Sequence, residues 1–385
     1  MNNIWLLSIV SLINDFSSKM ILPVLPLYIK QLGGAGLAIG LISGIGESIA
    51  SLLKVFSGYW SDKAGRRKPF VLGGYALSSV SKFLFYFASS WPIILVLRSF
   101  ERAGKGLRSA SRDAMLASTS EKKKRGKTFG IHRAFDSGGA VLGSIAALLL
   151  IWLLGFTIRN VFLAAGIIAF FSLLPIFFTR ETGSQKKAAK MRFIVSFKSL
   201  SKRLKLFMAV ATIFAFGNFS YMFFVIRSQE ILDGGDVLII PILLYILYNL
   251  FYTIMAVPSG MLADRMGKDK VLLMGYSLFI PVTAGFILFD SISAFIALFI
   301  VYGIMYAFIE SNERAYVSDL AEGNVRGTAL GTFFTLTSIA ALPAGIIAGL
   351  LYDVLPAYAF AYGGAAAAIS SVLMLVHIKA NSKSN

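Results

Sequence analysis

Charged side chains recur along one face of an otherwise apolar segment, residues 91–118. Their spacings of three, four and seven residues place them on the same side of an α-helix. A charge at the centre of a bilayer costs roughly 2.5–3.5 kcal/mol on insertion scales, so this face must meet water, a ligand or opposite charges. We therefore predict that it binds an anionic group of a substrate. The residues concerned are Arg98, Glu101, Arg102 and Lys105.

Acidic side chains in three other apolar segments could carry a proton. Asp15, Glu47 and Asp136 each lie near the middle of an expected helix. A carboxyl group whose access to water alternates can load and release a proton, so we expect one of the three to couple transport to protons. The alternative is a network of permanent ion pairs with the charged face, which would serve packing alone. Lys82 is expected to face away from any water-filled cavity, in a paired or snorkelling role.

The elements that must hold these charges are long apolar helices. Of 385 residues, 57% are apolar and 15% are charged, whereas soluble domains contain about 45–50% and about 25%. Twelve stretches are long enough, or nearly so, to cross ~30 Å of hydrocarbon. They are residues 4–30, 36–60, 69–89, 91–118, 127–154, 159–179, 206–226, 237–263, 271–289, 292–309, 327–352 and 354–376. The sequence predicts an all-α integral membrane protein with twelve transmembrane helices.

Basic residues gather in alternate connections between these stretches. The positive-inside rule places those connections in the cytoplasm, so we expect a multi-pass protein of the cell membrane with both termini cytoplasmic. The net charge of +18 then reflects this bias and contact with lipid rather than binding to nucleic acid. The chain contains no Cys and two His, and no complete nucleotide-binding loop. We expect no metal, no cofactor and no enzymatic activity.

The two halves of the chain form a weak internal repeat. An offset of 202 residues aligns Gly58, Asp62 and Gly65 with Gly260, Asp264 and Gly267. A nearly constant offset between halves that start on the same membrane side predicts a parallel repeat of six helices. We expect a bundle at 1–179, a basic cytoplasmic linker at 180–205 and a second bundle at 206–385. Residues 191–204 of the linker either lie on the anionic leaflet or form a simple tether.

The connection between spans two and three resembles the G-x-x-x-D-(R/K)-x-G-R-(R/K) signature of the major facilitator superfamily. The matching residues are Gly58, Asp62, Gly65, Arg66 and Arg67, with a partial copy at Asp264 and Gly267. The resemblance implies two six-helix bundles, related by a pseudo-two-fold axis, that rock about a cavity lined by spans one, four, seven and ten. It also implies that the signature latches a cytoplasmic gate, with Asp62 bound to the start of span eleven near Arg326. The alternative is that these residues only fix the turn and the topology.

Further gate and substrate residues follow from the alignment of the halves. The pair Arg112 and Asp113 aligns with Glu313 and Arg314 in inverted charge order, with Glu310 close by. We therefore predict an ion pair between the bundles near the cytoplasmic side. Asn218 and Tyr221 align with the region of Asp15, so we expect them to be uncharged substrate contacts, with ordinary packing as the alternative.

Together these features predict a secondary active transporter that works by alternating access as a monomer among membrane lipids. Its substrate is expected to be a small organic solute, anionic or zwitterionic and amphipathic, and its coupling ion a proton. A resemblance to drug- and metabolite-efflux members favours export. Two departures from the pattern of the antiporter members weaken the assignment of export. In span four, position 100 is Phe100 where those members have Arg, and in span five no Pro accompanies Gly138 and Gly139. An uptake symporter and an uncoupled lipid or solute facilitator remain the alternatives.

Overall fold

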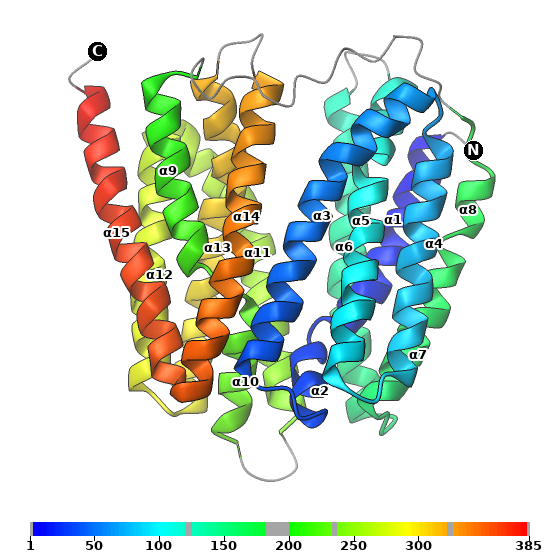
Figure 1. Ribbon diagram of the computed structural model, residues 1–385, viewed down its shortest axis with the longest axis horizontal. Coiled ribbons are helices and arrows are strands. Elements are labelled where there is room, and N and C mark those ends of the chain that lie inside the picture. The colour runs from blue at the N-terminus through cyan, green and yellow to red at the C-terminus, as the bar shows by residue number, and fades with distance from the viewer. Residues whose placement is uncertain (1–2, 121–124, 182–199, 233–236, 322–325, 383–385) are drawn as a thin grey trace. The chain divides into compact units, whose positions relative to one another are not determined.

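The computed structural model describes residues 3–120, 125–181, 200–232, 237–321 and 326–382, without the side chains of 125–126, 326–328 and 380–382. Every regular element in these ranges is a helix (Figure 1). Eleven segments of the described chain are long and apolar enough to cross a membrane. The remaining predicted span, α5 (Trp91–Thr119), is 29 residues long but carries the charged stripe. The protein is therefore an all-α, multi-pass membrane protein.

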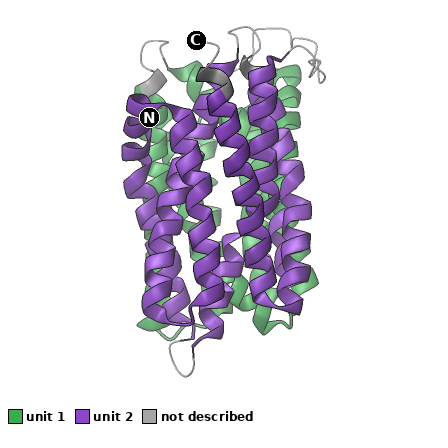
Figure 2. Ribbon diagram, turned by 90° about the vertical axis from the view of Figure 1, so that its left-hand side faces the viewer, with its two compact units in different colours: residues 1–34, 45–191 green, residues 35–44, 192–385 purple. Residues whose placement is uncertain are grey.

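The helices group into two compact units (Figure 2). Unit 1 comprises residues 1–34 and 45–191, and unit 2 comprises residues 35–44 and 192–385. Besides α5 and most of α3 (Gly36–Ala64), unit 1 contains α1 (Asn3–Ile21), α2 (Leu25–Gln31), α4 (Lys68–Leu84), the short 3-10 helix η1 (Phe85–Phe87), α6 (Arg125–Trp152), α7 (Ile158–Phe171) and α8 (Leu174–Phe177). Unit 2 contains α9 (Lys202–Gly217), α10 (Tyr221–Glu230), α11 (Ile239–Met266), α12 (Lys268–Leu288), α13 (Ile292–Leu320), α14 (Arg326–Val354) and α15 (Pro356–Ser382).

Three expected spans are broken into two helices each, which the hydropathy pattern did not predict. The first and sixth expected spans divide into α1 and α2 and into α7 and α8, and a proline occupies the first turn of the second helix in each pair. Proline lacks a backbone N–H and is tolerated in that first turn. The seventh divides into α9 and α10 at residues 218–220, where the Ser220 hydroxyl accepts the Met222 N–H at 3.3 Å.

Glycines set how closely the helices of unit 1 approach. A Cβ atom added at Gly104 of α5 would lie 2.5 Å from the carbonyl oxygen of Gly74 on α4. One added at Gly106 would lie 2.5 Å from the carbonyl oxygen of Ala50 on α3. Small residues let helix backbones meet in this way within membranes. Close packing on two sides therefore holds the charged face of α5 against its neighbours.

The start of α3 belongs to unit 2 because it packs on α14. The Asp353 carboxylate accepts the backbone N–H groups of Gly36 and Leu37 at 2.5 and 2.9 Å. It thereby satisfies two N–H groups that a helix start leaves unpaired, and it lies at the positive end of the helix dipole. A Cβ at Gly40 would clash with the Gly345 carbonyl, so the two helices cross in direct backbone contact.

Each copy of the repeated loop contains a glycine with positive φ. Gly65 has a φ of 66° and Gly267 has a φ of 99°, a conformation that favours glycine. The predicted domain boundaries at 179 and 206 stay a prediction, and most of the linker lies outside the described residues.

Candidate functional site

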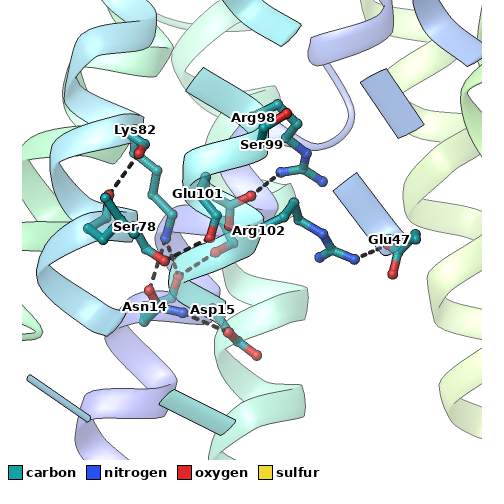
Figure 3. Close-up of polar contacts among 12 residues, drawn as sticks. Asn14, Asp15, Glu47, Ser78, Lys82, Arg98, Ser99, Glu101 and Arg102 are labelled. Carbon is teal, nitrogen blue, oxygen red and sulfur yellow. Dashed lines mark hydrogen bonds and ion pairs between the residues drawn. The ribbon is translucent and has the colours of Figure 1, made fainter. Parts of the chain in front are cut away.

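The charged face of α5 is the centre of a polar cluster inside unit 1 (Figure 3). Arg98 Nη1 donates to Glu101 Oε2 at 2.7 Å, and both side chains are less than a tenth exposed. Arg102 pairs with Glu47 of α3, whose carboxylate is 58% exposed. Three of the four predicted substrate-binding residues of α5 are therefore engaged in internal ion pairs. This is the arrangement that the packing alternative anticipated for them.

Lys82 of α4 is paired inside unit 1, which agrees with the expectation of a paired role. Its side chain is fully buried, and its ammonium donates to the backbone oxygen of Asn14 at 3.1 Å and to its Oδ1 at 3.0 Å. Ser78, one turn earlier on α4, donates to the Glu101 backbone oxygen at 3.0 Å and accepts from Arg108 Nη1 at 2.5 Å. Neither Asn14 nor Ser78 was predicted, because no spacing rule assigns partners to residues on different helices.

Two of the expected proton-coupling residues lie side by side. Asp15 of α1 and Asp136 of α6 are close enough to act on each other electrostatically. Two neighbouring carboxylates repel each other, so a proton on one of them relieves the repulsion. Ser11 also donates to Asp136 at 2.7 Å, and Arg133 lies 3.4 Å from it. The third candidate, Glu47, is instead the partner of Arg102.

Lys105 differs from the other cations of the charged face. Its side chain is exposed, although Asp15, Glu101, Arg102 and Arg108 all act on it electrostatically. Within the described part of the chain, its ammonium makes no ion pair. An exposed cation among charged neighbours must face water rather than lipid. Of the residues predicted to bind an anionic group, Lys105 is the one that the structure leaves available.

In unit 2, Asn218 and Tyr221 flank the break between α9 and α10. Asn218 Oδ1 accepts the Tyr306 hydroxyl at 3.3 Å. The ring of Tyr221 lies 5.0 Å from that of Tyr245 between centroids. Both predicted residues therefore meet tyrosines, which the sequence alignment of the halves did not indicate.

Two of the signature residues form an ion pair within unit 1. Asp62 pairs with Arg67 Nη2 at 3.2 Å, and Arg67 Nη1 donates to the Ala114 backbone oxygen at 3.3 Å. Arg66 is exposed, and a Cβ at Gly58 would lie 3.3 Å from that of Ala110. The expected partner of Asp62, the helix start at 326–327, has side chains outside the described residues. The role of Asp62 in a gate therefore stays a prediction.

The remaining gate candidates have partners within their own unit. Arg112 lies 3.0 Å from Asp113, and Arg314 lies 3.4 Å from Glu310. Glu313 accepts the Tyr276 hydroxyl at 2.9 Å. In the second copy of the signature, Asp264 is exposed. In the described ranges, no group of three or more His, Asp or Glu side chains could hold a metal ion.

Comparison with known proteins identifies the class to which this fold and these charged spans belong. The sequence model of the Major Facilitator Superfamily matches residues 7–244 and 240–385. An uncharacterized MFS-type transporter of Methanocaldococcus jannaschii is 45% identical over 97% of this chain and 94% of its own length. The chain therefore belongs to the major facilitator superfamily, and it is a transporter.

More distant similarities agree on the fold. The crystal structure of the nucleoside transporter NupG superposes with a TM-score of 0.79 at 14% identity, covering 98% of this chain and 99% of that one. The quinolone resistance protein NorA of Staphylococcus aureus is 28% identical, but only over 32% of each chain. The first likeness shows the fold alone. The second is confined to about a third of the molecule.

Proposed function

We propose that this transporter moves a small organic solute bearing an anionic group across the cytoplasmic membrane, driven by protons. The observation that carries the proposal is Lys105, an exposed and unpaired cation among the described residues of a membrane-spanning helix. A cation in that position costs too much to keep unless water or an anionic ligand reaches it. The neighbouring Arg102 adds positive charge that an incoming anion would meet.

The coupling proton is proposed to reside on the pair formed by Asp15 and Asp136. A proton on one of two neighbouring carboxyl groups relieves their repulsion, and losing it leaves two repelling charges. Lys105 acts electrostatically on Asp15. An anion that neutralises this lysine would therefore change how readily the pair holds its proton, which provides a physical link between solute and proton.

Export is the favoured direction, with both termini on the cytoplasmic side and the chain working as a monomer among lipids. The similarity of one third of the chain to a resistance protein supports export. Uptake by symport and uncoupled movement of a solute or lipid are the competing functions. The direction of the proton relative to the solute separates these functions. Antiport moves the proton against the solute, symport moves it with the solute, and uncoupled movement involves no proton.

The test uses purified protein in liposomes that contain a pH-sensitive dye, and a panel of organic anions, zwitterions and neutral analogues. We expect proton movement only with solutes that carry an anionic group. Lys105→Met should reduce it at least tenfold, whereas Lys127→Met, which changes an exposed lysine at the start of α6, should not. Asp15→Asn should abolish it. Solute flux that is equal with and without a pH gradient would overturn coupling, and proton movement with neutral analogues would overturn the anion site.

A further inference from the structure

Unit 2 contains a cluster of tyrosine rings on α11 and α13. Ring centroids lie 4.9 Å apart for Tyr248 and Tyr302, 5.6 Å for Tyr248 and Tyr306, and 5.0 Å for Tyr302 and Tyr306. Tyr302 is fully buried, whereas Tyr248 and Tyr306 are partly exposed. The faces of aromatic rings carry negative potential and attract cations, most strongly where water is excluded.

Two carboxylates continue this cluster along α13. Tyr302, Tyr306, Glu310 and Glu313 are spaced by four, four and three residues, so they share one face of the helix. The Tyr252 hydroxyl donates to Glu310 Oε2 at 2.8 Å. Both glutamates act electrostatically on Tyr306.

The charges of this face do not cancel. Arg314 pairs with Glu310, while Glu313 makes no ion pair with any residue in the described ranges. Two carboxyl groups with one guanidinium between them leave room for one more cation. The face therefore suits one monovalent cation.

The broken span adds hydrogen-bond acceptors at the same place. Asn218 ends α9, and its Oδ1 accepts the Tyr306 hydroxyl. The C-terminus of a helix carries partial negative charge. Discontinuous spans in transporters present such helix ends to cations. The fully buried Tyr302 hydroxyl also has no hydrogen-bond partner among the described residues, so it can bond to a ligand.

We infer that this tyrosine–glutamate cluster binds an organic ammonium group of the transported solute. Its residues are Asn218, Tyr248, Tyr302, Tyr306, Glu310 and Glu313. Ring faces and carboxylates would hold the positive charge, and the groups at the helix break would accept hydrogen bonds from the ligand. The inference rests on the proposed function and narrows its substrate class to zwitterions. It also gives Glu310 and Glu313 a binding role in addition to the predicted gate.

The test is calorimetric titration of the purified full chain in detergent with choline, and with its neutral isostere 3,3-dimethylbutan-1-ol. We expect saturable binding of choline and none of the alcohol. Tyr306→Leu should weaken binding about tenfold, because it removes a ring face, and Glu310→Gln should weaken it by a similar factor. Tyr306→Phe keeps the ring and should bind within about threefold of the unaltered protein. Tyr358→Leu changes an exposed tyrosine of α15 and should have no effect.

The outcomes separate this site from the proposed coupling. The titration uses no pH gradient and a probe without an anionic group, so it can succeed even if Lys105 or Asp15 has no role in transport. Equal binding of choline and the alcohol would overturn the inference, as would unchanged affinity in both Tyr306→Leu and Glu310→Gln. If Tyr306→Leu does not fold, failure of folded Glu310→Gln to weaken binding overturns it. Choline binding with no proton movement for any solute would instead count against the proposed function alone.

Discussion

Two of the ion pairs of α5 differ in how exposed the acidic side chain is. Glu101 is 3% exposed and its partner Arg98 is 9% exposed. Glu47 is 58% exposed, whereas its partner Arg102 is 9% exposed, the same fraction as Arg98. An ion pair that solvent reaches contributes little to stability, whereas breaking a buried pair leaves a charge without compensation. The depth of the carboxylate therefore decides the cost of losing it.

We predict that Glu101→Gln destabilises the protein by roughly 3 kcal/mol. Glu47→Gln should cost about 1 kcal/mol or less, because water can replace the lost carboxylate. Thermal unfolding of both purified variants in the same detergent measures the difference. A melting temperature that falls equally in the two, or further for Glu47→Gln, contradicts this account of the cluster.

Helical periodicity was sufficient to find the charged face, but not the partners of its residues. The spacing from Arg98 to Lys105 predicted one face of a helix, and the structure has that face. The contact of Lys82 with Asn14 joins residues 68 positions apart. The proximity of Asp15 and Asp136 likewise depends on two helices lying together. Which helices are neighbours depends on packing between elements, so a single sequence pattern does not contain these pairs.

At the scale of the helices, glycine contacts decide how α4 and α5 pack. Gly74 and Gly104 face each other, and a Cβ at Gly74 would lie 2.6 Å from the Gly104 carbonyl oxygen. This distance is shorter than a carbon–oxygen contact allows, and the obstacle is backbone rather than a flexible side chain. A larger residue therefore has to separate the helices that carry Lys82 and Glu101.

We predict that Gly104→Val destabilises unit 1 by more than about 2 kcal/mol, since overpacking a close contact typically costs 1–3 kcal/mol. Gly138→Val on α6 is the matched control, because a Cβ there meets nothing within 4 Å. The fraction of each variant that elutes as a monodisperse species in size-exclusion chromatography, before and after heating, reports the effect. Wild-type behaviour of Gly104→Val would show that the helices can separate without cost.

The existence of the spans followed from hydropathy, whereas their breaks did not. Residues 218–220 carry no charge and lie between long apolar stretches, so a composition window sees one helix where the structure has α9 and α10. A local signal was present in Ser220, a residue type that favours helix starts and here accepts the Met222 N–H. Pro26 gave a similar signal for α2. Caps and prolines therefore mark helix breaks that hydropathy averages away.

At the scale of the whole chain, the repeat preserves backbone shape better than chemistry. Gly65 and Gly267 both adopt positive φ. Unit 1 surrounds its charged helix with lysine, arginine and carboxylates. Unit 2 presents tyrosines with Glu310 and Glu313. Charged residues within the expected spans are concentrated in the first half of the sequence, but no spacing indicated the tyrosine cluster.

The same divergence distinguishes the two signature aspartates. Asp62 pairs with Arg67, which also binds the end of α5 through the Ala114 oxygen. Asp264 is exposed, and the corresponding contact in unit 2 is made by Lys268 with Asp319 at 2.6 Å. If the signature works as a gate, its first copy therefore has the more specific connection to the helix that carries the charged face.

We predict that Asp62→Asn slows solute-driven proton movement in liposomes at least fivefold, whereas Asp264→Asn changes it less than twofold. The reason is that neutralising Asp62 removes the ion pair that holds Arg67 beside α5, a charge-assisted contact worth roughly 1 kcal/mol or more. Both variants should reach the membrane in normal amounts, because each aspartate is substantially exposed. Rates are compared per reconstituted protein, with the solute that gives the largest signal. Equal slowing by the two variants would mean that both copies of the signature serve the gate alike, and a normal rate for Asp62→Asn would reduce its role to shaping the turn.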